Sequence, residues 1–207
     1  MEDQAMNQSN QSSQSNEKII DTVVIDGVEF TVIEKAKTFY AGSYFVANDP
    51  DDIRNAEPDW DASGKWFENN KHRIIGSITP ECVIGFSIDY TSDERPCAVL
   101  HGQETNTPNQ PDGFYVMEAE PAILIRVKAT DASWALTKKL TGYDPICLSP
   151  LFFLIWHLFC DGGECKYERT GDIVKGHHEA VYHYYDNGDR YVTVPVKLKG
   201  VIPEQWN

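Results

Sequence analysis

Residues 178–198, HEAVYHYYDNGDRYVTVPVKL, form the stretch from which the fold is most readily predicted. β-Branched and aromatic residues, which favour strands, lie on both sides of Asp186-Asn187-Gly188, a sequence typical of a tight turn. We therefore expect a β-hairpin. Alternation along 181–185 places aromatic and imidazole groups on the faces of a sheet, and such a surface suits a planar organic ligand as well as a core.

The chain before the hairpin is predicted to alternate between strands and short helices. Apolar and aromatic runs predict extended segments at 19–25, 28–33, 37–46, 82–90, 97–104, 114–119 and 122–129. Helices are expected from Asp61 or Ser63 to about residue 76, from 131 to 140, and from 151 to 160, where Ser149 and Pro150 provide a start signal. The predicted fold class is therefore α+β.

The order of these elements suggests two similar halves separated by a polar linker at 105–113. Each half reads strand, helix, strand, strand, with Trp66 on a helix of the first half and Trp156 on a helix of the second half. Pairing two such units would bury both sheet faces and leave a cleft along a pseudo-two-fold axis. We expect duplicated βαββ units, with repeat one at about 28–104, repeat two at about 113–198 and a ligand cleft between the repeats. Ordinary α+β packing with accidental similarity is the alternative.

Composition limits the classes of partner. The net charge of −14 and the absence of a basic patch argue against direct nucleic-acid binding, whereas an acidic field favours cationic ligands. Residues 1–17 are mostly Gln, Asn and Ser and are predicted to be a disordered tail, which leaves 18–207 as a single domain.

The sequence also predicts a cytoplasmic protein without a metal, a cofactor or a membrane anchor. Its five cysteines form no CxxC pair, no signal peptide is visible, and the most apolar run, 146–160, is too short to span a bilayer. His177, His178, Glu179 and His183 could suggest zinc, but His178 and His183 would face opposite sides of a strand. Common catalytic and nucleotide-binding motifs are missing from the sequence.

Four segments resemble the GyrI-like, or AraC-type effector-binding, superfamily. They are FSIDYTS at 86–92, VLHGQE at 99–104, PDGF at 111–114 followed by EPA at 120–122, and YDNG at 185–188 followed by VTVPVK at 192–197. The resemblance covers about 28–197 and implies a duplicated βαββ fold with a ligand cleft. Members include effector domains of drug-responsive transcription regulators, standalone proteins and a few hydrolases. Because no DNA-binding segment precedes the domain in this sequence, the resemblance implies a standalone member.

The resemblance also implies a site, in which a buried acid facing the cleft pairs with a cationic aromatic ligand. Two residues before Tyr185, where the family often has glutamate, this chain has His183. Glu104, Glu118 and Glu179 are the alternative acids, and aromatic walls would add cation–π attraction. The candidate ligand-binding residues are Trp66, Tyr90, Glu104, Trp156, Glu179, Tyr182, His183 and Tyr184. For each of them an ordinary place in the core or on the surface is the alternative.

Three functions remain open from the sequence. The first is binding of an aromatic or cationic small molecule without catalysis, linked to transcription regulation or to a drug or toxin response. The second is hydrolysis of a small reactive electrophile, with a carboxylate or His183 as general base and a tyrosine as partner. The third is an interaction module that sequesters a regulatory protein through its acidic surface.

Overall fold

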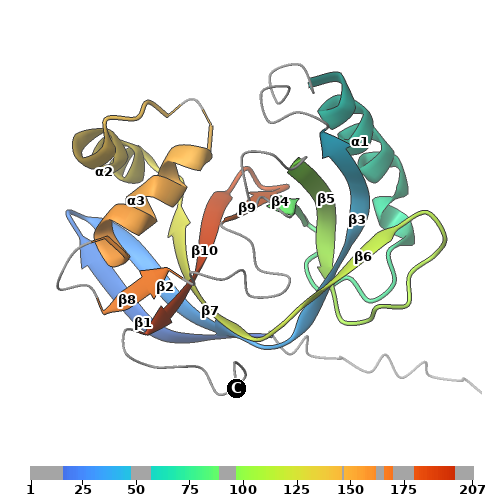
Figure 1. Ribbon diagram of the computed structural model, residues 1–207, viewed down its shortest axis with the longest axis horizontal. Helices are drawn as coiled ribbons and strands as arrows, with labels where there is room; N and C mark the ends of the chain where they lie inside the picture. The colour runs from blue at the N-terminus through green and yellow to red at the C-terminus, as the bar shows by residue number, and fades with distance from the viewer. Residues whose placement is uncertain are drawn as a thin grey trace, which may run out of the picture.

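The computed structural model describes residues 16–47, 57–88, 97–145, 147–161, 166–169 and 180–198. This part of the chain forms one antiparallel sheet of ten strands with three α-helices (Figure 1), which confirms the predicted α+β class. The strands are β1 (Glu17–Ile25), β2 (Val28–Lys35), β3 (Thr38–Ala47), β4 (Cys82–Ile88), β5 (Cys97–Thr105), β6 (Tyr115–Ala119), β7 (Ala122–Lys128), β8 (Tyr167–Arg169), β9 (Val181–Tyr185) and β10 (Arg190–Leu198). The helices are α1 (Glu57–Asn70), α2 (Asp131–Thr141) and α3 (Ser149–Phe159), and a 3₁₀ turn, η2 (Lys71–Arg73), follows α1.

The strand pairings and the chain connection between β2 and β3 together form a closed circuit. From β2 the hydrogen-bonded order runs through β7, β10, β9, β4 and β5 to β3, and β3 follows β2 directly along the chain. Lys35 pairs with Ala122 and Thr38 with Ala119, so β2–β3 and β6–β7 stay aligned across their bend. The sheet thus has an inner face turned away from the helices and an outer face that packs against them.

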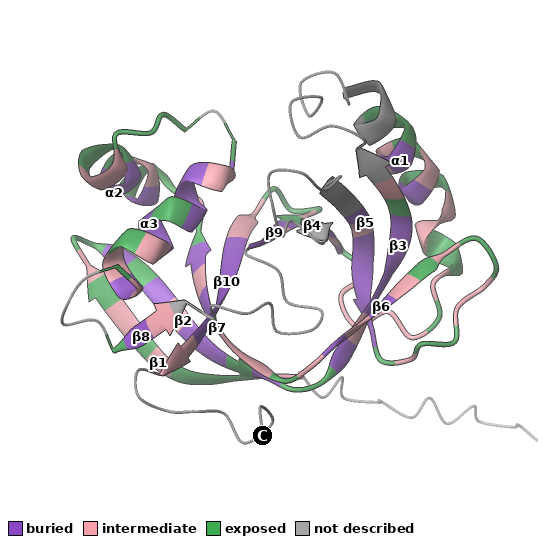
Figure 2. Ribbon diagram, viewed as in Figure 1, coloured by how far each residue is buried: buried purple, intermediate pink, exposed green. Residues whose placement is uncertain are grey.

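The outer face carries the larger hydrophobic core. Helices α2 and α3 pack against each other and over β2, β7 and β10, whereas α1 lies over β3 and β5 (Figure 1). Alternation on β2 sends Val28, Phe30 and Val32 into this core, and α3 contributes Leu151, Leu154 and Ile155. The helix has Pro150 in its first turn, as its sequence predicts, but it begins at Ser149 and its N-cap is Leu148, so Ser149 does not cap it. Figure 2 shows the buried positions running along β7 and β10 beneath α3.

The inner face holds a second, smaller core. Its buried members are Tyr40, Cys82, Ile84, Leu100, Met117, Ala119 and Val181, which come from β3, β4, β5, β6 and β9. This core lies where strands from both predicted halves face one another, and it stabilises the closed circuit from inside by burial of apolar surface.

Most element boundaries agree with the sequence prediction. Helix α1 already begins at Glu57, four residues before the predicted cap at Asp61, and β8 forms at Tyr167–Arg169, where no strand was predicted. β1 begins at Glu17, the last residue of the predicted tail, while residues 1–15 lie outside the described part. In the described part of the chain, no helix has the length and apolar character needed to cross a bilayer.

Two glycines give a test of the packing between β3 and β5. Gly42 and Gly102 are paired across these strands, and a Cβ at Gly42 would collide with the backbone of His101. Gly42→Ala should therefore lower the free energy of unfolding by about 1–3 kcal/mol in urea titrations. Gly64→Ala is the matched control, because Gly64 lies inside α1 with open space around it. There a methyl group should stabilise by about 1 kcal/mol. Equal stability of both variants would contradict this packing.

Candidate functional site

A cluster of buried charges lies on the inner face of the sheet. Lys35, at the end of β2, is 1% exposed, and its Nζ donates to Glu104 Oε2 at 2.7 Å and to Glu17 Oε1 at 2.9 Å. Arg126 Nη2 donates to the same Glu17 oxygen at 2.8 Å. Thr38 Oγ1 donates to the second oxygen of Glu104 at 2.8 Å. We call Glu17, Lys35, Glu104 and Arg126 the inner charge cluster.

The charges of this cluster stabilise one another. Burial alone would raise the pKa of Glu17, but Lys35 and Arg126 together lower it to about 2. Burial would likewise lower the pKa of Lys35, yet the neighbouring Tyr40 and the two glutamates hold it above its usual value. Burial raises the pKa of Tyr40 to about 12, so the phenol keeps its proton. Lys35 and Glu17 are therefore both charged at neutral pH.

His183 lies on the same face and is sealed in the core. It is 7% exposed, its Nε2 is 3.0 Å from Thr193 Oγ1, and its Nδ1 is 4.0 Å from Cys82 Sγ. Burial, reinforced by Arg126 and Lys35, lowers the pKa of His183 well below its usual value. Burial raises the pKa of Cys82 to about 11. The imidazole and the thiol are thus both neutral at physiological pH.

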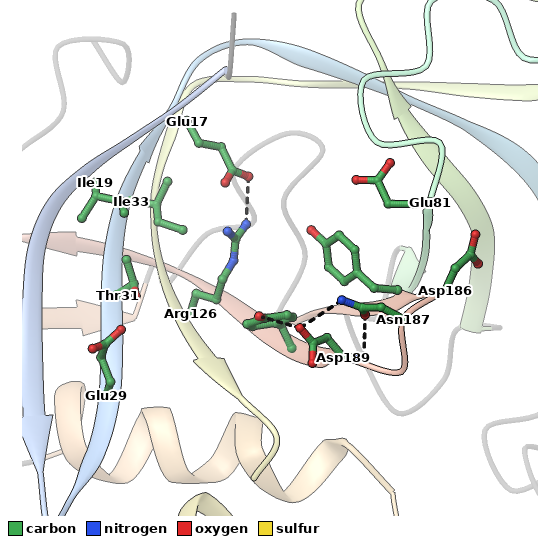
Figure 3. A pocket seen from close by; sticks show the side chains of 12 residues that line it. Glu17, Ile19, Glu29, Thr31, Ile33, Glu81, Arg126, Asp186, Asn187 and Asp189 are labelled. Atoms are coloured by element: carbon green, nitrogen blue, oxygen red, sulfur yellow. Dashed lines mark hydrogen bonds and ion pairs between the residues drawn. The ribbon is translucent and has the colours of Figure 1, made fainter. Parts of the chain in front are cut away.

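A pocket of about 830 Å³ opens beside this cluster (Figure 3). It lies over the inner face of β1, β2 and β7 and reaches the turn between β9 and β10. The lining residues are Glu17, Ile19, Glu29, Thr31, Ile33, Glu81, Arg126, Tyr185, Asp186, Asn187, Asp189 and Tyr191. We call this cavity the sheet pocket.

The sheet pocket is strongly acidic. Five carboxylates line it, and Arg126 is the single cationic side chain among its described lining residues. Two of the five already have cation partners, since Glu17 bonds Lys35 and Arg126, and Asp189 bonds Lys128 at 2.7 Å. The remaining three, Glu29, Glu81 and Asp186, are solvent-exposed and have no ion-pair or side-chain hydrogen-bond partner in the described part of the chain.

The pocket also has an aromatic and aliphatic wall. The rings of Tyr185 and Tyr191 meet edge to face, with centroids 5.6 Å apart, and Ile19 and Ile33 lie on the opposite side (Figure 3). Burial raises the pKa of Tyr185 to about 12, so this phenol remains neutral. Such walls can hold the apolar body of a ligand while carboxylates bind its charge.

Two of the predicted site residues, Glu104 and His183, are buried on the inner face, where they have different partners. Glu104 is 6% exposed, and Lys35 already supplies the cation that we expected a ligand to bring. Neither residue lines the sheet pocket. Tyr90 and Glu179 lie outside the described residues, so the structure does not place them.

The predicted aromatic residues lie elsewhere. Tyr182 and Tyr184 alternate with His183 on β9, and the Tyr182 hydroxyl donates to Ser149 Oγ at 3.4 Å on α3. Trp66 packs on Phe114, with ring centroids 5.2 Å apart, and Trp156 packs on Phe152 at 3.8 Å. The two tryptophans thus contact separate parts of the molecule and neither lines the sheet pocket.

Sequence reasoning missed Glu17, Lys35 and Arg126. One signal was present: Arg126 interrupts the apolar strand AILIRVK, and a charge in such a strand needs a partner because burying it alone is costly. Tyr185 and Asp186 were recognised as family-like residues but were not assigned to a site.

The structure indicates no metal centre in its described part, where no group of three His, Cys, Asp or Glu side chains could hold an ion. His177, His178 and Glu179 lie outside the described residues.

Comparisons with known proteins do not show a family. No family model matches the chain, and no curated protein matches it. An integron cassette protein from the mobile metagenome of Vibrio cholerae is 14% identical, with a TM-score of 0.49 over 81% of this chain and 95% of its own. SAV2435, solved bound to tetraphenylphosphonium, is 6% identical, with a TM-score of 0.46 over 81% and 93%. EcmrR, solved in a DNA complex, is 9% identical, with a TM-score of 0.44 over 82% and 57%. The resemblance to the GyrI-like superfamily therefore stays a prediction.

Removal of the buried ammonium tests the inner charge cluster. Lys35→Met should lower the free energy of unfolding by about 3–5 kcal/mol, because Glu104 loses its cation while remaining buried. Adding Glu104→Gln should recover part of that loss. Lys37→Met, two residues away at a half-exposed pair with Glu118, should cost less than about 1 kcal/mol. Urea unfolding measures all three variants, and wild-type stability of Lys35→Met would refute the assignment.

His183 predicts how stability depends on pH. Its pKa in the folded state lies below the unfolded value near 6.5, so the unfolded chain binds the proton first and stability falls as pH drops below that value. The expected slope is up to about 1.4 kcal/mol per pH unit. His101, which is partly buried and whose pKa is also lowered, adds to the wild-type slope. Protonation of Glu17 removes further stability as the pH falls from about 4.5 to 2.

Urea titrations at pH 7 and pH 5 check this prediction. His183→Gln should reduce the stability difference between the two pH values, whatever its effect on absolute stability. His157→Gln, at an exposed position on α3, is the control. An unchanged difference in His183→Gln would mean that this imidazole is not held neutral by the fold.

Proposed function

We propose that this protein binds an organic cation with an aromatic or apolar body in the sheet pocket. The observation that supports this most directly is the set of three carboxylates that have no partner in the described part of the chain, beside a wall of tyrosine and isoleucine side chains. A pocket of this size suits a drug-sized molecule, since small-molecule sites commonly occupy roughly 300–1,000 Å³.

The charge balance favours a cation over an anion. Three carboxylates at or near the pocket form ion pairs with three cations, so their charges cancel. The carboxylates are those of Glu17, Glu104 and Asp189, and the cations are Lys35, Arg126 and Lys128. Glu29, Glu81 and Asp186 remain as uncompensated negative charge at the pocket. A cation that loses part of its water there gains Coulomb attraction from the carboxylates. It also gains attraction from the tyrosine faces, worth roughly 0.5–2 kcal/mol.

Binding without catalysis is the better supported of the functions predicted from sequence. His183, the predicted general base, bonds Thr193 inside the core and does not line the pocket. The carboxylate most deeply set in the pocket, Glu17, has a pKa of about 2 and is a weak base. The hydrolase alternative would therefore depend on one of the exposed carboxylates Glu29, Glu81 and Asp186 as its general base.

We further propose that the protein is a standalone GyrI-like effector-binding domain, linked to transcription regulation or to a drug or toxin response. The order of the sheet supports the duplicated plan, because β3-β5-β4 and β7-β10-β9 meet at the β4–β9 pair. Helix α1 connects β3 to β4, so the first set reads strand, helix, strand, strand. In the second set α2, α3 and the short strand β8 connect β7 to β9, which adds one helix and one strand to that plan. In this plan β2 pairs with β7 of the second set rather than opening the first.

A pair of similar ligands with opposite charge tests the function. Benzyltrimethylammonium should raise the melting temperature and bind measurably by isothermal titration calorimetry, whereas phenylacetate should do neither. Added salt should weaken binding of benzyltrimethylammonium, because the carboxylates Glu29, Glu81 and Asp186 are exposed to solvent. Asp186→Asn should lower the affinity for benzyltrimethylammonium about two- to fivefold.

Glu34→Gln is the matched control, since Glu34 is exposed on β2 and absent from the pocket lining. This variant should bind as wild type does. Equal binding of the two ligands, or no binding of the cation at millimolar concentration, would refute the proposal.

A further inference from the structure

We infer that the ligand of the sheet pocket carries two cationic groups joined by an uncharged spacer. This inference rests on the proposed function and names the class of ligand more narrowly. It follows from the positions of Glu29, Glu81 and Asp186, which have no ion-pair partner among the described residues, and from Arg126, the one cationic side chain in the described lining that separates them.

The three carboxylates form two groups at different sides of the pocket. Asp186 N donates to the backbone oxygen of Glu81 at 2.9 Å, so these two residues are neighbours at the turn between β9 and β10. Glu29 lies on β2, on the other side of the pocket (Figure 3). One ammonium group can therefore meet either Glu29 or the Glu81–Asp186 pair.

The strand order sets the separation of the two groups. β7 and β10 lie between β2 and β9, which makes three strand intervals. At the usual spacing this corresponds to about 14 Å measured along the sheet. A ligand that uses both ends must be long, and its two charges must be far apart.

The middle of the pocket disfavours a third positive charge. Arg126 lies there between Glu29 and Asp189 (Figure 3), and Glu17 holds the pKa of this guanidinium above its usual value despite burial. The Nε–H group of Arg126 is buried and has no acceptor in the described part of the structure. A ligand ammonium is itself a donor and cannot accept a hydrogen bond from this group. Tyr185 and Tyr191 offer apolar ring surface at the same level. An uncharged spacer fits this section and an ammonium does not.

The end near Glu29 has room for a bulky head group. A second cavity of about 360 Å³ adjoins the sheet pocket and shares Glu29, Thr31, Arg126 and Tyr191 with it. It continues toward Gly27 and Thr130. Its other cation, Lys128, is already bonded to Asp189 at 2.7 Å. Glu29 thus borders both cavities, where a quaternary ammonium could be accommodated.

Decamethonium and decyltrimethylammonium give a matched test, because both have a ten-carbon chain and they differ in whether the far end is charged. Isothermal titration calorimetry on the full chain should show decamethonium binding at least about fivefold tighter. Its affinity should also fall more steeply with salt, since two exposed contacts are screened. Hexamethonium, with a shorter spacer, should lose this advantage.

Variants at the two ends make the test specific. Glu29→Gln should bring decamethonium down to the affinity of decyltrimethylammonium and change the latter less than about twofold. Asp186→Asn should weaken both ligands, and Glu34→Gln should change neither. Because these carboxylates are exposed, unchanged melting temperatures of the free variants confirm that the fold is kept.

Each outcome decides between the two proposals. If the two ligands bind equally, the dication inference falls while cation binding stands. If neither binds, and benzyltrimethylammonium also fails, the proposed function falls. If spermine, which carries charge within its chain, binds more tightly than decamethonium, the uncharged spacer is refuted.

Discussion

The structure depends on one buried ammonium group. Lys35 lies where β2 ends and the chain bends into β3, and its Nζ bridges Glu17 of β1 and Glu104 of β5. This bend carries the chain from one side of the sheet to the other. A buried charge tolerates few alternative partners, because any arrangement that leaves it unpaired is costly. The pairing therefore fixes the relative position of three strands at the point where the strand circuit closes.

The same cluster determines the electrostatics of the sheet pocket. Glu17 bonds both Lys35 and Arg126, so the guanidinium at the centre of the pocket is compensated from one side. Together with the Lys128–Asp189 pair, this confines the excess negative charge to the exposed carboxylates at the edges. The buried charges thus act as scaffold, while the exposed ones are available to a partner. This division explains why Glu104, although acidic and buried, is not the residue that would meet a ligand.

Local signals in the sequence were sufficient for the elements but not for their long-range pairing. The turn at Asp186-Asn187-Gly188 and the helix start at Ser149-Pro150 depend on signals within a few residues. The turn was predicted correctly, and so was the helix, although its N-cap is Leu148 and Ser149 is already its first residue. Period-two alternation also placed His183 opposite Tyr182 and Tyr184 on β9. In contrast, the contact between Lys35 and Glu104 spans 69 residues, and no local pattern indicates it. Glu17 was hidden for a different reason, since it directly follows a polar segment that reads as disordered.

The closed circuit has a kinetic consequence. Its seams join segments distant along the chain: Lys35 pairs with Ala122, and Cys82 pairs with Tyr185. The entropy cost of closing the long loops must be met before the contacts of such pairings stabilise the chain. The hairpins can form early and reversibly, but the circuit of strands becomes fully cooperative only when the last long-range strand pair has formed. The rate of folding is then limited by topology, and a chain that has not yet closed its ring presents unpaired strand edges to other chains.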